Sequence, residues 1–194
     1  LFWYATRHLA VISAQGGKLE LPTFKLDRNV SSPKFLADGK SISFIWEDSG
    51  EQRLGRMAPT GGEVSWVIAG PRAVTEFDLS KDGTPVALVS EPTIPGEVFV
   101  VESGKLRQLT RTNDALMAQI RLGEVEKARF KSRDGTDVEG FFVKPPSFDP
   151  AFKYPTLLRI HGGPTSATTT AMRLGIQFYT SRGIAVLDVN YGGS

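Results

Sequence analysis

A regularly spaced set of turn sequences most constrains how this chain can fold. Asp38-Gly39 recurs as Asp82-Gly83, 44 positions later, and each pair lies between two apolar runs. Asp-Gly between apolar runs indicates a β-hairpin, because these residues tolerate the positive φ that a type I′ turn requires. Further turn pairs, Gly16-Gly17, Gly61-Gly62 and Ser103-Gly104, follow a similar spacing. The sequence therefore predicts four short strands in each unit of about 45 residues.

Four short strands in a period of about 40–45 residues are typical of a β-propeller blade. Residues 1–121 are therefore predicted to form blades of a partial β-propeller, with a string of hairpins in a β-sandwich as the alternative. A propeller needs at least about four blades, and only about two and a half fit here. We therefore expect the chain to be an internal piece of a longer protein.

The pattern changes near residue 113, and residues 122–194 are predicted to open a second domain. A short helical turn at 113–120 and a hairpin at Asp134-Gly135 are expected first. An apolar strand at 154–160, a helix-permissive segment at 165–182 and an apolar strand at 184–191 follow. This order predicts a βαβ unit and a parallel sheet covered on both faces. The positions expected to be buried in the helix are Met172, Leu174, Ile176, Phe178 and Tyr179.

Charge and composition exclude several classes of function. The 194 residues hold 23 Lys and Arg against 21 Asp and Glu, a formal net charge of +2, with the two signs interleaved. A nucleic-acid binder usually shows a basic stripe, so no nucleic-acid partner is expected. No apolar run is long enough to cross a membrane. The chain has no cysteine and only two histidines, His8 and His161, so no metal site and no cofactor are expected.

The segment His161-Gly162-Gly163-Pro164 is where the sequence predicts chemistry. A Gly-Gly pair directly after a strand exposes backbone N–H groups without a Cβ in the way. In α/β-hydrolases this place supplies one donor of the oxyanion hole. Such a donor stabilises the negative charge that develops on the substrate carbonyl oxygen.

Together these motifs resemble the prolyl oligopeptidase family of serine peptidases, in particular its acylaminoacyl-peptidase and dipeptidyl-peptidase-like branch. Besides the repeats, the resemblance rests on Ser132-Arg133-Asp134-Gly135, Lys144-Pro145-Pro146, the segment 161–164 and the segment 188–194, in which Gly192 replaces the family's common arginine.

The resemblance implies a fold, an activity and one site residue. The fold is a partial β-propeller (its C-terminal blades), followed by the N-terminal part of an α/β-hydrolase domain. The activity is that of a serine-type peptidase that acts on short peptides through an acyl-enzyme, without a metal or cofactor. The Gly163 N–H is the oxyanion donor, supported by its neighbours in the 161–164 segment.

The remaining candidates suit catalysis less well. The triad order in α/β-hydrolases is Ser, Asp, His, and His161 precedes any credible nucleophile, so we expect it to shape the glycine loop. His8 is expected to be structural or exposed. Ser194 completes the first half of Gly-x-Ser-x-Gly, but the resemblance places it one strand before the nucleophile. Ser166 is expected to begin the helix and Asp188 to accept hydrogen bonds at a strand end. We therefore predict that the nucleophile, Asp and His of the triad are absent from this chain and that it is inactive alone.

Two other functions stay open. One is a propeller-based binding protein with a degenerate hydrolase remnant, and the other is an esterase of the same fold, which the repeats disfavour. A homo-oligomer is compatible with the sequence. No signal peptide is visible in a chain that starts at Leu1, and both a cytoplasmic and a secreted or periplasmic location stay open.

Overall fold

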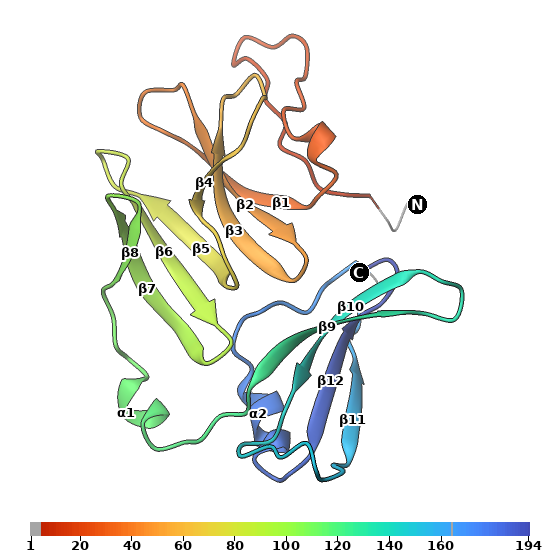
Figure 1. The fold of residues 1–194 in the computed structure, drawn as a ribbon. Helices are drawn as coiled ribbons and strands as arrows, with labels where there is room; N and C mark the ends of the chain where they lie inside the picture. Colours follow the sequence, from red (N-terminus) through yellow and green to blue (C-terminus); the bar gives the residue numbers. More distant parts are fainter. Residues whose placement is uncertain (1–4, 164) are drawn as a thin grey trace.

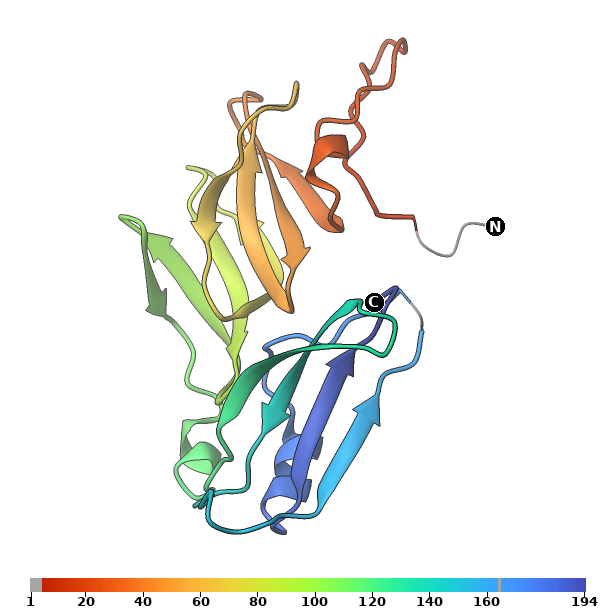
Figure 2. The same ribbon diagram turned by 45° about the vertical axis from the view of Figure 1, so that its right-hand side comes forward.

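The computed structural model describes residues 5–163 and 165–194, and its strands form two sheets (Figures 1 and 2). The first sheet follows a 3-10 helix, η1 (Phe24–Leu26), and contains β1 (Val30–Phe35), β2 (Ile42–Asp48), β3 (Glu51–Met57), β4 (Ser65–Ile68), β5 (Ala73–Leu79), β6 (Pro85–Glu91), β7 (Ile94–Glu102) and β8 (Lys105–Gln108). A short helix, α1 (Asp114–Met117), leads to the second sheet, which contains β9 (Val125–Lys131), β10 (Asp137–Val143), β11 (Thr156–Ile160) and β12 (Ala185–Asn190), with α2 (Leu174–Thr180) between the last two.

The pairing of the first sheet overturns the predicted fold class. Its order is β1-β2-β3-β5-β6-β7-β8, and β4 pairs with β3 outside this path. A single parallel pair, Gln52 with Ala73, joins β3 to β5. The described residues thus form one branched sheet of eight strands and no closed propeller. The prediction of a partial β-propeller followed by the N-terminal part of an α/β-hydrolase domain is therefore wrong. Turn spacing indicates where strands begin and end, but it does not encode which strand edges meet.

The turns of the first sheet were predicted in the right places but with the wrong geometry. Asp38-Gly39 joins the antiparallel strands β1 and β2, and Asp82-Gly83 joins β5 and β6. In both pairs only the glycine has positive φ, at 64° and 83°. A type I′ turn requires positive φ at both central residues. This geometry occurs instead at Ser103-Gly104, with φ of 49° and 73°.

Apolar side chains form separate cores in the two sheets. In the first sheet, one cluster surrounds Leu54 and Val74 and another surrounds Ile42 and Phe44, all at most 2% exposed. In the second sheet, Val143, Ile176 and Val186 form a smaller cluster. Burial of these side chains is the main favourable contribution to the stability of each sheet.

The second sheet has the order β11-β12-β10-β9. β11 pairs with β12 in parallel, and α2 lies between them in sequence, so the βαβ unit is confirmed. The expectation of a parallel sheet covered on both faces is wrong. β10 runs antiparallel to both β12 and β9, and every residue of β11 is exposed.

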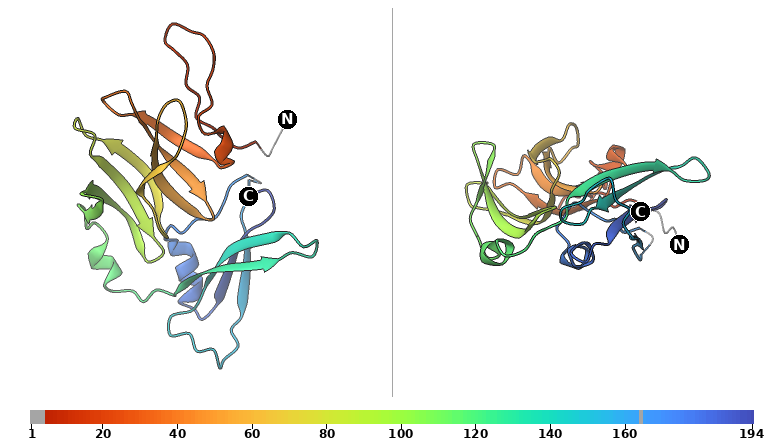
Figure 3. Two further views of the ribbon diagram at one scale, coloured as in Figure 1. Left: turned by 45° about the horizontal axis from the view of Figure 1, so that its top comes forward. Right: turned by 60° about the horizontal axis from the view of Figure 1, so that its bottom comes forward.

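The helix of the βαβ unit is shorter than predicted. α2 packs beside β10 and β12, as Figure 3 shows, but covers only Leu174–Thr180 of the expected 165–182. Of the five expected positions only Ile176 is buried, whereas Leu174 and Phe178 are 55% and 60% exposed. The residues before it cannot continue a helix, because two of their backbone donors bond to the first sheet: Thr170 N–H to the Gly50 carbonyl and Met172 N–H to the Ser90 hydroxyl.

Substitution by alanine is expected to change the free energy of unfolding in opposite directions at two glycines. A Cβ at Gly140 in β10 would lie 2.4 Å from the backbone oxygen of Asp188 in β12, whereas a Cβ at Gly175 in α2 meets nothing within 4 Å. Gly140→Ala should therefore lower the free energy of unfolding by about 1–3 kcal/mol. The matched control Gly175→Ala should raise it by about 0.5–1 kcal/mol. Urea denaturation measures both, and equal effects would contradict the close approach of β10 and β12.

Candidate active site

The predicted glycine loop follows β11 and is open on one side. His161, Gly162 and Gly163 come directly after Ile160, and Pro164 lies outside the described residues. Gly163 has a φ of 70°, which an L side chain rarely adopts. Among the described residues the Gly163 N–H has no hydrogen-bond acceptor. A Cβ at Gly162 would meet nothing within 4 Å. The loop can therefore offer a backbone donor to a bound group.

His161 is held between the ends of β11 and β12. Its ring stacks on Tyr191 with a centroid distance of 4.7 Å, and the Tyr191 hydroxyl donates to the His161 carbonyl at 3.0 Å. Its Nε2 lies 2.9 Å from the Ser194 Oγ, and its Nδ1 lies 3.1 Å from the Ser166 Oγ. The structure thus brings together three residues that the sequence analysis considered separately.

These contacts do not make a catalytic triad. In a triad the histidine nitrogen that does not face the nucleophile is hydrogen-bonded to a carboxylate. Within the described residues, Nδ1 of His161 faces the Ser166 hydroxyl and the Gly162 carbonyl. Ser194 therefore meets a histidine without the carboxylate that would orient it.

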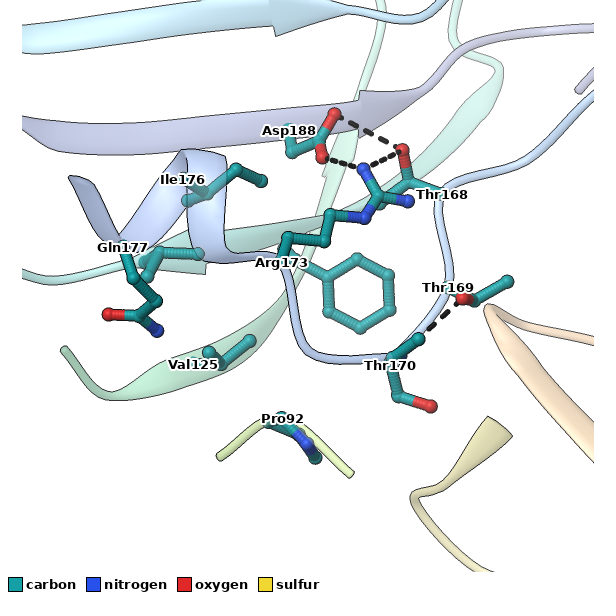
Figure 4. Close-up of a pocket in the computed structure, with 12 residues that line it drawn as sticks. Pro92, Val125, Thr168, Thr169, Thr170, Arg173, Ile176, Gln177 and Asp188 are labelled. Atoms are coloured by element: carbon teal, nitrogen blue, oxygen red, sulfur yellow. Dashed lines mark hydrogen bonds and ion pairs between the residues drawn. The ribbon is translucent and has the colours of Figure 1, made fainter. Parts of the chain in front are cut away.

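Asp188, on β12, is fully buried and serves a different set of partners. Its carboxylate accepts hydrogen bonds from Arg159 at 2.8 Å, Arg173 at 2.5 Å and the Thr168 hydroxyl at 3.1 Å. Figure 4 shows Thr168 and Arg173 converging on it. Burial lowers the pKa of Arg173 below its ordinary value, against the opposing effect of Asp188. The carboxylate therefore joins β11, β12 and the segment that follows the glycine loop.

Sequence reasoning missed the amide of Asn190. Its Oδ1 accepts the Thr168 N–H at 2.6 Å, and its Nδ2 donates to the Thr168 carbonyl at 3.0 Å. Asn190 stands two positions after Asp188 on β12, so both side chains lie on one face of the sheet. This i, i+2 spacing of two polar residues in an apolar strand was the available signal.

The segment after the loop also touches the first sheet. A Cβ at Gly50, in the β2–β3 turn, would lie 2.6 Å from the ring of Phe141 and 3.2 Å from the Thr168 carbonyl oxygen. Next to this contact, Glu51 accepts hydrogen bonds from Lys127 in the second sheet, at 2.7 Å, and from Arg53. An ion pair and close packing therefore join the two sheets.

The other sequence candidates lie elsewhere. His8 contacts the Thr6 hydroxyl at 2.9 Å and packs against Phe24. Among residues 5–163 and 165–194, no three His, Cys, Asp or Glu side chains are arranged to hold a metal ion. Within those same ranges, no helix is long and apolar enough to span a membrane.

Comparisons with known proteins show that the chain is similar to proteins named as peptidases. No protein-family model matches the chain. The chain is 29% identical over 123 residues to an uncharacterized peptidase of Bacillus subtilis, covering 62% of the chain and 19% of that protein. It is 26% identical over 176 residues to dipeptidyl-peptidase 5 of Porphyromonas gingivalis, covering 89% of the chain and 25% of that protein. The chain thus spans a quarter or less of the length of these two relatives.

Solved structures share the fold of this chain. The acylaminoacyl peptidase of Pyrococcus horikoshii matches with a TM-score of 0.77 and 25% identity, over 90% of this chain and 27% of that one. The AtxE2 isopeptidase matches with a TM-score of 0.71 and 16% identity, over 93% of this chain and 28% of that one. The predicted resemblance to peptidases of the prolyl oligopeptidase family is confirmed.

The ion pair between the sheets predicts a pH-dependent stability. Burial alone raises the pKa of Glu51, but hydrogen bonds from Lys127 and Arg53 outweigh it, so the pKa lies below its ordinary 4.5. Because the pKa is lower in the folded state, the stabilisation is complete above pH 4.5 and is lost as the pH falls through the folded value.

Glu51→Gln should therefore lower the free energy of unfolding at pH 7 by about 1–3 kcal/mol and flatten its dependence on pH below 4.5. Urea denaturation between pH 3 and pH 7 measures this. The control is Asp137→Asn, which removes an exposed pair with Lys131 and should change little. An unchanged pH profile in Glu51→Gln would contradict the role of the ion pair.

Proposed function

We propose that this chain is part of a serine-type peptidase that acts on short peptides through an acyl-enzyme. The observation that carries the proposal is the open Gly163 N–H directly after β11, in a chain whose relatives are named as peptidases. In such a reaction a serine oxygen attacks the peptide carbonyl carbon, and the carbonyl oxygen becomes negatively charged. The Gly163 N–H donates to that oxygen and stabilises it more than it stabilises the substrate.

In this reaction the chain supplies the oxyanion loop and its support, but not the catalytic triad. His161, which lies between Tyr191 and Ser194, fixes where the loop leaves β11. Nucleophile, general base and orienting carboxylate are not assigned to residues of this chain, since His161 contacts no carboxylate among the described residues. A division into residues 1–121 and 122–194 belongs to the same proposal, supported by the separate cores of the two sheets.

The 194-residue chain is expected to be inactive by itself. Without an oriented triad, the purified chain should not turn over N-acyl or aminoacyl chromogenic peptides, and a serine-directed phosphonate should not label it. Mass spectrometry of the treated chain checks the labelling. Phosphonate-sensitive turnover with label on Ser194 would make Ser194 the nucleophile and would overturn this assignment.

The source gene tests the peptidase proposal directly. Downstream of the Ser194 codon we expect a Gly-x-Ser-x-Gly motif, then an Asp and a His, in the order found in α/β-hydrolases. The encoded protein should hydrolyse peptides in preference to simple esters. A reading frame without these residues would favour a binding protein, and a preference for simple esters would favour an esterase.

The role of Gly163 can be tested in that longer protein. At a φ of 70° an alanine is strained, so Gly163→Ala should move the N–H away from the carbonyl oxygen. We expect kcat to fall about 100-fold, comparable to the loss of one oxyanion donor, with little change in KM. The matched control is Gly162→Ala, because Gly162 lacks the positive φ and has open space around it. Equal kinetics for the two variants would contradict the assignment of Gly163.

A further inference from the structure

We propose that Asp188 and Asn190 are positioning residues that hold the Gly162-Gly163 loop in shape through Thr168. The inference rests on the proposed function for its catalytic meaning, and on geometry alone for the positioning. It explains why two polar side chains stand on one face of β12, a strand with mostly apolar, buried residues.

The side chains of Asp188 and Asn190 are both hydrogen-bonded to Thr168. It is 1% exposed, and its hydroxyl donates to Asp188 at 3.1 Å. Its N–H donates to the Asn190 Oδ1 at 2.6 Å, and its carbonyl accepts from the Asn190 Nδ2 at 3.0 Å. Every polar group of one loop residue is therefore hydrogen-bonded to β12. Such a residue loses several hydrogen bonds at once if it moves.

Asp188 is itself fixed by charge. Its side chain is 0% exposed, and burial of a carboxylate is costly unless charged and polar partners replace the solvent. Arg159 lies on β11, two residues before His161, and Arg173 directly precedes α2. Arg173 also donates to the Thr168 hydroxyl at 3.3 Å. The carboxylate therefore holds the strand that precedes the glycine loop and the segment that follows it.

A short connection transmits this restraint from Thr168 to Gly163. The Ser166 N–H donates to the Gly163 carbonyl at 2.9 Å, and the Ser166 hydroxyl donates to the carbonyls of Gly162 and Gly163 at 2.7 and 3.0 Å. Ser166 is two residues from Thr168. With Thr168 fixed to β12 and Ser166 closing the turn, the direction of the Gly163 N–H is restrained from its C-terminal side.

The segment is anchored beyond Thr168 as well. The Thr170 N–H donates to the Gly50 carbonyl at 2.7 Å, and the Met172 N–H donates to the Ser90 hydroxyl at 2.9 Å. These anchors come from the first sheet, so they position residues 170–172 but not the glycine loop itself. Of these three anchored residues, Thr168 is the nearest in sequence to Gly163.

The test compares Thr168→Val with Thr168→Ser in the full 194-residue chain. Valine has nearly the shape of threonine but cannot donate to Asp188, whereas serine keeps the hydroxyl. The readout is the ¹⁵N order parameter of the Gly163 amide. We expect about 0.85 in the unaltered chain and in Thr168→Ser, and a value below about 0.6 in Thr168→Val. Asn190→Ala is the second variant and should also loosen Gly163, because it removes both hydrogen bonds to the Thr168 backbone.

The matched control is Glu97→Gln. Glu97, on β7 of the first sheet, is also a buried carboxylate, 2% exposed, and it is hydrogen-bonded to Thr110 and Asn113 in the segment after β8. Its substitution should reduce stability without loosening Gly163. The proposal is overturned if Gly163 stays rigid in Thr168→Val and Asn190→Ala. It is also overturned if Glu97→Gln loosens Gly163 as much as they do.

Kinetics in the longer protein separate this proposal from the proposed function. A positioning role predicts a kcat about tenfold lower in Thr168→Val, a KM within about twofold of the unaltered protein, and recovery of kcat in Thr168→Ser. If Gly163 loosens as expected but the longer protein has no peptidase activity, the proposed function fails and the positioning of the loop stands. If KM rises while kcat is unchanged, the catalytic meaning of the positioning is overturned.

Discussion

The buried carboxylate of Asp188 is the interaction on which the candidate site depends. Removing a charge from water costs several kcal/mol unless charged and polar partners replace the solvent. The partners here are Arg159 from β11, Arg173 at the start of α2 and the Thr168 hydroxyl. All three partners must reach the Asp188 carboxylate. Independent movement is therefore restricted for the strand before the glycine loop, the segment after the loop and β12. The shape of the loop is thus a consequence of satisfying one buried charge.

The contact between the two sheets also restrains the segment after the glycine loop, through backbone hydrogen bonds instead of a buried charge. The β2–β3 turn approaches the second sheet so closely that a Cβ at Gly50 would lie 2.6 Å from Phe141. In this close contact the Gly50 carbonyl accepts a hydrogen bond from the Thr170 N–H. Three backbone donors of the segment 168–172, those of Thr168, Thr170 and Met172, are therefore hydrogen-bonded to acceptors outside it, and the helix begins only after Arg173. The same contact that joins the sheets therefore keeps these residues out of the helix.

Local signals in the sequence were sufficient for much of the second sheet. The apolar runs around 154–160 and 184–191 became β11 and β12, and the segment between them supplied α2. Asp134-Gly135 joined β9 to β10 as expected. These features depend on side-chain pattern and on turn residues close in sequence. The helix length could not be predicted, since the acceptors at Gly50 and Ser90 are distant in sequence.

By itself, the sequence determined the positions of the hairpins, the βαβ unit, the glycine loop after β11 and the resemblance to peptidases. Only the tertiary structure decided that the first eight strands join in one branched sheet and that β10 runs antiparallel to β12. It also decided that Asp188 serves arginines rather than His161. The physical reason is the range of the interactions. Turn preference and hydrophobic pattern act over a few residues, whereas strand-edge hydrogen bonds and the pairing of a buried charge join residues that only the folded chain brings together.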